Sequence, residues 1–385
     1  MKLPVFLFGL FLISLNFKND LFQLISLGGF SLKLFHVNAL ICLFFCYLSF
    51  LQRKVFTYYI LPVLIINVVG FAAFPMINPG LEGFFKFCFW FLCTWIGYSF
   101  STRYYQETYK VVSLACLLII SLVFIKNLLF VDTIILKWQL GYAHPQADWN
   151  FFNVSTNSNR EVAFVSGYGI MLLAGSRKYL PYFYSIINTV ITKVSGSIFV
   201  HFLFLAKKWV FNWWAIAVFF ISVIVIFTSF DLSEYYRLGS DRIYLWFLAV
   251  VEFSNFDPIN ILSGRGLGAT ISYFESFERE TSIISLNQDM EDFHNNYLNI
   301  FYDIGLLGLI LYLACIVRPI FLDFKRKYSN NLRAIIIFLI LFLFYGLISS
   351  HPNDPIFATF FGIYLGCKRV EVKYLINDTN NTSET

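Results

Sequence analysis

Charge is scarce in this chain of 385 residues. Only 13% of the residues are Asp, Glu, Lys or Arg, whereas 58% are hydrophobic, and the mean hydropathy is +0.68. Apolar runs long enough to cross a bilayer recur from one end of the sequence to the other, which is typical of a polytopic membrane protein. The composition therefore predicts an all-α integral membrane protein with about 12 transmembrane helices, forming a single polytopic membrane domain over residues 1–385.

Motifs of soluble enzymes are also lacking. The sequence contains no GxxxxGK phosphate loop, no HExxH zinc helix and no nucleotide-binding βαβ pattern, so nucleotide-driven soluble chemistry is not expected. All seven cysteines fall inside apolar segments and none forms a CxxC pair, which argues against a disulfide framework or a cysteine-based metal site. We predict neither a metal nor another cofactor, and no nucleic-acid partner.

Basic residues cluster at the ends of the apolar runs. Because Lys and Arg are enriched in cytoplasmic loops, these clusters predict the orientation of the chain, with both termini in the cytoplasm. The apolar segment 3–17 has no small-residue cleavage site after it, so it is predicted to be a retained helix and not a signal peptide. The clusters are Arg53/Lys54, Arg103/Lys110, Arg177/Lys178, Lys207/Lys208, Arg318 with Lys325, Arg326, Lys327 and Arg333, and Lys368/Arg369.

The segment between Lys178 and Lys207 is too short for the crossings that this orientation requires. Both lysines are assigned to the same side, so an even number of crossings must connect them, yet residues 179–206 number only 28 where two full helices need about 40. We predict two short helices, 179–194 and 197–206, that turn at the sequence TKVSGS. Unwound backbone at that depth is tolerated only where protein or a water-filled cavity surrounds it. The alternative is one long tilted helix, which inverts the C-terminal half against its charge.

Three segments of some length then face outward: residues 131–159, 231–293 and 349–355. The second carries 11 acidic residues and four arginines, so its arginines are expected to be isolated cations in an acidic surround, although Asp241 beside Arg242 could form a local ion pair. Apolar residues at helical spacing in 241–253 predict an amphipathic helix on the outer leaflet, which would hold Arg242 at headgroup depth.

One stretch concentrates polar residues at the mouth of an apolar run. Residues 291–308 read EDFHNNYLNIFYDIGLLG, and the apolar run continues to Val317. Polar clusters at such a place are costly and usually functional. A histidine there can accept a proton from a sugar hydroxyl, and arginines at headgroup depth suit a phosphate or pyrophosphate because a guanidinium stays charged and donates a bidentate fork. Together these groups indicate group transfer from a lipid-linked pyrophosphate donor to a hydroxyl.

The order of these motifs resembles that of bacterial O-antigen polymerases and O-antigen ligases. The resemblance covers roughly residues 140–320. Its combination of HNxYL with GLLG in this topology is more specific than any single piece. It rests on NSNREVAFVSGYG, TKVSGS, DRIYLW, GRGLG and FHNNYLNIFYDIGLLGLILYL, in that order.

The resemblance implies a membrane-embedded glycosyltransferase of the bacterial inner membrane, whose large periplasmic loop, 231–293, precedes the tenth helix. Its substrate would be an undecaprenyl-pyrophosphate-linked oligosaccharide, with membrane lipid and a chain-length regulator protein as further partners. His294 matches the family's histidine, a general base, and Arg242 matches a loop arginine that binds pyrophosphate. The family frequently has an arginine after the serine of the broken-helix turn, where this chain has Gly196.

The remaining candidate residues are assigned to substrate binding. They are Arg265, Arg160, Lys193, Asn295 and His351, of which the first three are candidates for the charge missing at position 196. For some of the candidate residues a purely structural role is the alternative. His294 could cap the following helix together with Asn295, Arg265 could belong only to a glycine turn, and His351 could shape the turn that Pro352 begins.

Two other functions stay open. An O-antigen ligase, which transfers finished polymer to the lipid A core, is the close competitor, and the missing arginine mildly favours a polymerase. A flippase or other transporter of lipid-linked oligosaccharides would be expected to carry charges deep inside several helices and to show internal repeats. In this chain the charges lie at segment ends, and only the second half has a large outer loop.

Overall fold

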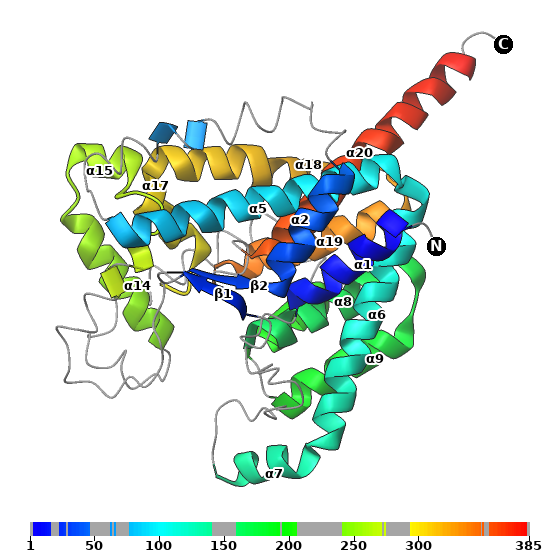
Figure 1. The fold of residues 1–385 in the computed structure, drawn as a ribbon, viewed down its shortest axis with the longest axis horizontal. Helices are drawn as coiled ribbons and strands as arrows, with labels where there is room; N and C mark the ends of the chain where they lie inside the picture. The colour runs from blue at the N-terminus through cyan, green and yellow to red at the C-terminus, as the bar shows by residue number, and fades with distance from the viewer. Residues whose placement is uncertain are drawn as a thin grey trace.

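The fold is that of a computed structural model. Most of its described residues are helical, as predicted; besides the turns between helices, they include a two-stranded antiparallel hairpin of β1 (Gln23–Leu27) and β2 (Phe30–Lys33). Figure 1 shows that α14 and α15 lie at one end of the molecule and both termini toward the other. The described residues are 3–16, 23–27, 30–46, 62–63, 65–66, 77–140, 159–192, 195–205, 241–271, 273–274, 293–347, 349 and 354–382.

The helices follow the apolar runs of the sequence. Those before the large predicted loop are α1 (Leu3–Asn16), α2 (Leu34–Cys46), α5 (Ile77–Arg103), α6 (Tyr105–Leu129), α7 (Val131–Gln139), α8 (Asn159–Ser176), α9 (Tyr179–Thr192) and α10 (Ser195–Leu205). Those after its start are α14 (Asp241–Ser254), α15 (Pro258–Ser263), α17 (Asn296–Tyr312), the π-helical turn η4 (Leu313–Val317), α18 (Arg318–Phe324), α19 (Asn330–Tyr345) and α20 (Pro355–Thr382). The helix α7 occupies part of 131–159, which we expected to be an outer loop.

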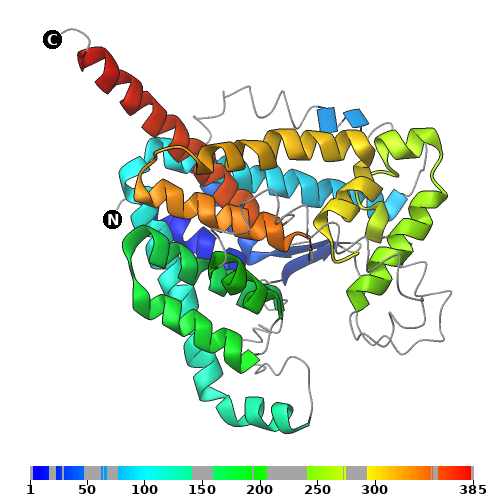
Figure 2. The same ribbon diagram turned by 180° about the vertical axis from the view of Figure 1, so that it is seen from behind.

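Two helices are long and apolar enough to cross a membrane: Tyr105–Leu129, and the stretch Asn296–Phe324 formed by α17, η4 and α18, which has an internal break described below. Shorter apolar helices include Leu3–Asn16, Val162–Ser176 and Asn330–Tyr345. The helices do not share one axis, since α6 runs steeply across the direction of α5 and α17 (Figures 1 and 2). The structure thus has two candidate membrane-spanning helices by length and composition among its described residues, and the count of 12 crossings stays a prediction.

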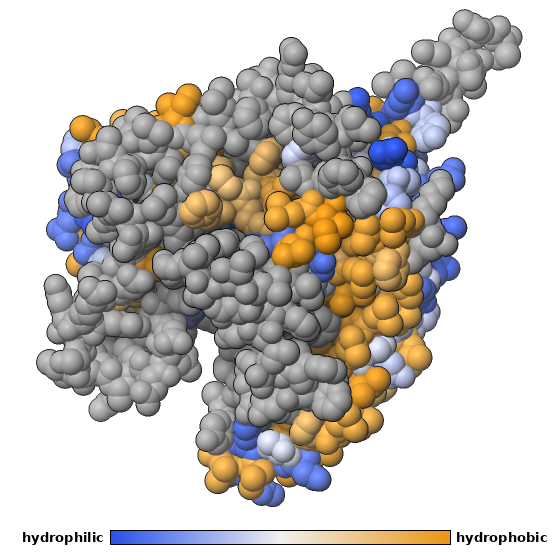
Figure 3. Space-filling model, in the orientation of Figure 1, coloured by the Kyte–Doolittle hydropathy of each residue, from blue (hydrophilic) through white to orange (hydrophobic). Residues whose placement is uncertain are grey.

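The exposed face of α6 is apolar. Leu114, Leu118, Leu122 and Ile125 recur every three or four residues along it and are 51%, 43%, 37% and 46% exposed, so they form one stripe. In Figure 3 a hydrophobic surface follows this helix down the right-hand side of the molecule. A stripe of this kind suits contact with lipid, because apolar side chains are less favourable in water than in contact with acyl chains.

The pair α9 and α10 confirms the predicted interruption within residues 179–206. The two helices are antiparallel, since the Tyr182 ring near the start of α9 lies 5.5 Å from the His201 ring and 6.2 Å from that of Phe204 near the end of α10. The chain therefore returns toward the side from which it came, as the charge argument required. These contacts contradict the alternative prediction of one long tilted helix over residues 179–206.

The helix α9 is polar inside and apolar outside. Its buried residues are Pro181, Ser185, Asn188, Thr189 and Thr192, whereas Leu180, Phe183 and Val190 are more than half exposed. Hydrogen bonds join the buried face to its neighbours: Asn127 Nδ2 donates to Asn188 Oδ1 over 2.9 Å, and the Ser166 and Thr189 hydroxyls lie 3.0 Å apart. This pattern is expected of a helix that meets lipid, because polar groups buried between helices find partners there.

Glycines let α5 and α20 pack closely. A Cβ at Gly362 would overlap the carbonyl oxygen of Thr94, one at Gly366 would lie 2.7 Å from that of Tyr98, and one at Gly97 would overlap that of Thr359. Gly362 and Gly366 form a GxxxG pair, the spacing at which small residues let two helix backbones approach in a membrane. We did not predict this helix contact from the sequence.

A network of buried carboxylates ties the helices together at the end of the molecule that carries Arg326, Lys368 and Arg369, called the basic end below. Asp323, 2% exposed, accepts from the hydroxyls of Tyr364 and Tyr328 and pairs with Lys368 Nζ at 2.5 Å. Glu371 accepts from the Ser329 hydroxyl and backbone N–H and from the Tyr105 hydroxyl at 2.5, 2.9 and 2.8 Å. Residues from two of the predicted cytoplasmic clusters thus lie at one end.

Candidate functional site

The site begins with a break in α17. Ile304 (φ −127°) and Gly305 (φ +66°) are not helical, so the helix that starts at Asn296 stops after Asp303 and a second one follows. The backbone of α15 and its following turn crosses α17 at this break. A Cβ at Gly305 would lie 2.5 Å from the Gly264 nitrogen, and one at Gly264 would lie 2.5 Å from the Asp303 oxygen. Both segments that meet at the crossing therefore need a glycine at the point of contact.

The break frees backbone carbonyls that the glycine turn then binds. In a continuous helix the carbonyls of Tyr302 and Asp303 would accept from the residues four further along. Here they accept from the N–H groups of Arg265 and Gly266, over 2.9 and 2.8 Å. The turn SGRGLG and the motif DIGLLG, which are about 40 residues apart in the sequence, thus complete each other's hydrogen bonding, as buried backbone groups require.

The Asp303 side chain adds three further bonds to the same crossing. It accepts from the Gly268 N–H at 3.1 Å, the Thr270 N–H at 2.9 Å and the Thr270 hydroxyl at 2.7 Å. Positive φ angles at Gly266 and Gly268 (101° and 85°) shape the turn that presents these donors. We did not predict a role for Asp303 or Thr270 from the sequence, although a carboxylate two residues before a glycine inside an apolar run is itself a signal of such a contact.

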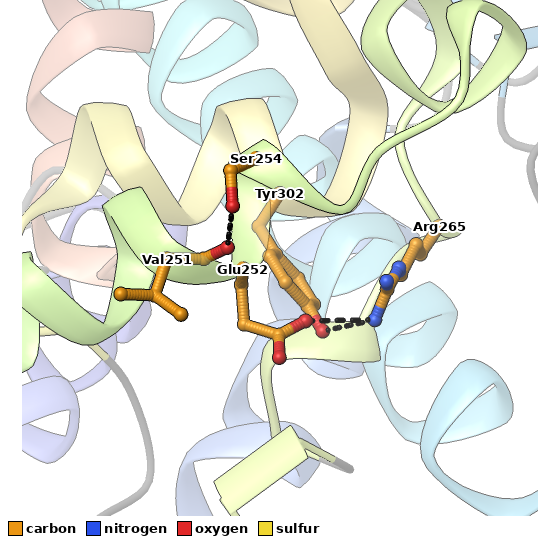
Figure 4. A network of polar contacts seen from close by, with 5 residues as sticks. All are labelled: Val251, Glu252, Ser254, Arg265 and Tyr302. Atoms are coloured by element: carbon orange, nitrogen blue, oxygen red, sulfur yellow. Dashed lines mark hydrogen bonds and ion pairs between the residues drawn. The ribbon is translucent and has the colours of Figure 1, made fainter.

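Arg265 lies inside this unit (Figure 4). Its Nη1 atom is 3.2 Å from Glu252 Oε2 and 2.9 Å from the Tyr302 hydroxyl, and its side chain is 16% exposed. The guanidinium carbon also lies 4.8 Å from the ring centroid of Phe256 and 5.3 Å from that of Tyr302, which suits a cation–π contact. We expected an isolated cation, but Arg265 is paired, because α14 and the glycine turn bring it against Glu252.

A small aromatic core packs α14 against the start of α17. It consists of Leu245, Ala249, Phe256, Ala269, Phe274, Phe293 and Tyr302. Phe293 is fully buried among these residues, and its ring centroid lies 5.0 Å from that of Phe274 and 5.4 Å from that of Tyr302. The backbone N–H of Phe293 also donates to Asn299 Oδ1 over 3.1 Å. The residue that immediately precedes His294 is therefore fixed by packing and by a hydrogen bond.

Asn295, which follows His294, is also held in place by hydrogen bonds. Its amide oxygen accepts from the N–H groups of Tyr297 and Leu298 at 3.0 and 3.2 Å, and its amide nitrogen donates to the Leu347 carbonyl at 2.9 Å. Asn295 is thus the N-cap of α17, a role typical of asparagine. The cap that we considered for His294 and Asn295 jointly belongs to Asn295 alone, and its amide is engaged within the protein.

His294 adopts a left-handed backbone conformation between these two anchors. Its φ is +49°, and only one other described non-glycine residue, Arg177, has a positive φ. The side chain is half-buried. Histidine reaches this region more readily than most residues, but a left-handed residue is still disfavoured and persists where its surroundings determine it. Such residues gather at functional sites, so the backbone supports His294 as the candidate base.

The start of α17 also lies beside the end of α19. The Asn296 N–H donates to the carbonyls of Gly346 and Ser349, over 2.8 and 3.1 Å. The third outward segment, 349–355, therefore begins next to His294. His351 itself lies outside the described residues.

The other candidate residues are placed only in part. Arg242 stands in the first turn of α14, one turn before Leu245, and Arg160 in the first turn of α8; the structure describes the backbone at both positions and not the side chains. Phe164, one turn after Arg160, stacks on Phe342 near the end of α19, with centroids 4.5 Å apart. Lys193 lies outside the described residues. Among the residues described, no group of His, Cys, Asp and Glu is arranged to hold a metal ion.

The structure thus unites His294, Asn295 and Arg265 with α14, the helix of Arg242, in one unit built by α14, α15 and α17. No protein-family model matches the sequence, and no curated protein matches it either.

Proposed function

We propose that the protein is a membrane-embedded glycosyltransferase that polymerises oligosaccharide repeats carried on undecaprenyl pyrophosphate. In this proposal the chain crosses the bacterial inner membrane about 12 times with both termini in the cytoplasm, and the site lies on the periplasmic face. The observation that carries it is the left-handed His294, held between a buried phenylalanine and the N-cap of α17, which leads through its break at Gly305 into a membrane-spanning candidate. Such a position lets an imidazole meet both water and a lipid-borne hydroxyl.

The reaction assigns a separate task to each residue. A grown chain on its lipid pyrophosphate is held with Arg242, whose guanidinium can bind two phosphate oxygens at once. A sugar hydroxyl of the incoming lipid-linked repeat gives its proton to His294 and attacks the anomeric carbon. The bond from that carbon to the pyrophosphate oxygen then breaks, and the pyrophosphate lipid leaves as an anion that the arginine stabilises.

The pairing of Arg265 with Glu252 changes its part in this proposal. A guanidinium already neutralised by a carboxylate at 3.2 Å offers less charge to a pyrophosphate than an arginine that is not so paired. Arg265 is better suited to hold α14 against α17, and so to position Arg242 relative to His294. Arg242, with Arg160, Lys193 and His351 as further candidates, then carries the contact with the substrate.

An O-antigen ligase that transfers polymer to the lipid A core would use the same groups with a different acceptor, and a flippase would move the lipid-linked repeat without chemistry. The glycans of a deletion strain separate the three functions. We expect lipid A core capped with a single repeat, the product of a strain that has lost its polymerase. Long polymer stranded on the lipid carrier would identify a ligase, and repeats trapped at the cytoplasmic face would identify a flippase.

The contribution of Arg242 can be measured with a charge-preserving substitution. Arg242→Lys should shorten or abolish the polymer while the amount of membrane-inserted protein stays unchanged, because a lysine cannot reproduce the bidentate fork. The measurement is polymer length on a gel, beside the abundance of protein in the membrane fraction. Arg103→Lys, at the opposite end of α5 from the site, is the matched control and should leave the polymer unchanged. Polymer of normal length from Arg242→Ala would exclude Arg242 from pyrophosphate binding.

A further inference from the structure

The short helix α15 exposes an apolar face although it lies within the segment predicted to be a water-facing loop. Ile259, Ile261 and Leu262 are 57%, 40% and 48% exposed, and the helix contains no charged residue. Its start is polar, because the exposed Asp257 caps it by accepting from the Asn260 N–H at 2.7 Å. Large exposed aliphatic side chains grouped in this way usually contact another apolar phase.

The crossing with α17 fixes the depth of α15. Gly305 lies against the backbone of Leu262 and Gly264, and the stretch from there to the end of α18 at Phe324 comprises 19 steps along the helix. Its two charged residues lie in the last two turns: the exposed Arg318 can extend its guanidinium toward the headgroups, and the buried Asp323 is paired with Lys368. At 1.5 Å per residue this is about 29 Å, close to the roughly 30 Å thickness of the bilayer hydrocarbon. Exposed Lys325, Arg326 and Lys327 follow directly at the basic end, so the other hydrocarbon boundary falls near Gly305.

Exposed aliphatic residues of α17 begin directly at its crossing with α15. Leu306, Leu307 and Ile310 follow the crossing and are 38%, 44% and 50% exposed. Since Leu262 meets Gly305, the exposed aliphatic residues of α15 stand at the end of the lipid-facing surface of the spanning helix. Continuity with that surface identifies the partner as lipid.

We propose that α15 lies in the membrane at the boundary between headgroups and hydrocarbon, with Ile259, Ile261 and Leu262 among the acyl chains. This inference rests on the proposal that α17 and α18 span the membrane, and it does not depend on the reaction. The partner is the bilayer itself, in the leaflet nearer His294. Through the bonds of Arg265 and Gly266 to the carbonyls of Tyr302 and Asp303, the embedded helix holds the candidate site at headgroup depth.

Spin labels on the full-length protein in lipid nanodiscs test this depth. With the native cysteines replaced, a label is placed at Ile259→Cys or Ile261→Cys. The matched controls are Ser254→Cys, at the exposed end of α14, and Ile310→Cys, on the exposed face of α17. Relaxation by oxygen, which concentrates in hydrocarbon, is compared with relaxation by a water-soluble nickel chelate.

We expect the labels on α15 to behave like the label at 310, with relaxation by oxygen and loss of relaxation by nickel, whereas the label at 254 is relaxed by nickel. Nickel relaxation at 259 and 261 equal to that at 254 would place α15 in water and overturn the inference, provided that 310 still reports lipid. Labels on α15 that are shielded from both reagents would overturn it too, because a protein partner would then cover the face. A label at 310 relaxed by nickel would refute the span itself.

Discussion

His294→Asn is expected to abolish chain extension while leaving the abundance of the protein near that of the wild type. An imidazole that accepts the proton of the attacking hydroxyl contributes about 10² to 10⁴-fold in rate, and an asparagine amide cannot accept that proton. Asparagine is the substitution of choice because it tolerates the left-handed conformation observed at position 294 and keeps a hydrogen-bonding side chain. Polymer formed by the purified protein from lipid-linked repeats is the quantity to measure.

A second substitution separates the backbone from the imidazole. His294→Gly removes the side chain and also the steric cost of the left-handed conformation, so it should be folded and inactive. If the asparagine variant still builds polymer of normal length, His294 is a structural residue. The base must then be sought elsewhere, and His351 is the next candidate because its segment begins beside Asn296.

Gly305→Ala is expected to destabilise the protein and to inactivate it without touching a proposed catalytic group. Gly305 (φ +66°, ψ −170°) has a backbone conformation that is essentially confined to glycine, and an alanine forced into it costs on the order of 1–3 kcal/mol. The alanine Cβ would also overlap the backbone of Leu262 and Gly264, which cannot move aside as a flexible side chain would. The crossing of α15 and α17 should therefore open. The thermal unfolding midpoint in detergent should fall, and polymer should be lost in the assay used for His294.

Gly9→Ala provides the matched control. Gly9 lies within α1, and a Cβ there would be 3.4 Å from Val111 Cγ1, an ordinary contact. The backbone of α1 is helical, so alanine should be neutral or stabilising by about 0.5–1 kcal/mol. A Gly305→Ala protein as stable and active as the Gly9→Ala protein would contradict the observed crossing.

Most helices and one irregular feature could be predicted from the sequence. The apolar runs mark α6, α17 and α19, and the charge on either side of residues 179–206 required the turn between α9 and α10. The helix of residues 241–253 also appears, as α14, since its apolar spacing is a local property. These predictions succeeded because hydropathy, helical period and the side preference of basic residues can be read from neighbouring positions.

The tertiary contacts of the site could not be predicted in the same way. Asp303, close to Gly305, indicates a polar contact, but the neighbouring residues do not reveal that α17 stops there, because the break depends on Gly264, about 40 residues earlier. The partner of Arg265 is equally remote from local reasoning: Glu252 is one of 11 acidic residues in its segment, and only the packing of α14 on α17 selects it. Asn295 was predicted to bind substrate because it is next to His294. In the structure it stands at the start of α17 and caps that helix.

The close fit of α5 and α20 has a consequence for how the protein is made. The two helices meet through Tyr98 and Arg369, whose side chains are 2.5 Å apart although 271 positions separate them in the chain. At a synthesis rate of about 5–20 residues per second, α5 emerges roughly 14–54 s before its partner. During that interval the face of α5 that receives α20 must be sheltered by lipid or by a membrane insertase, and final assembly waits for one of the last helices to be translated.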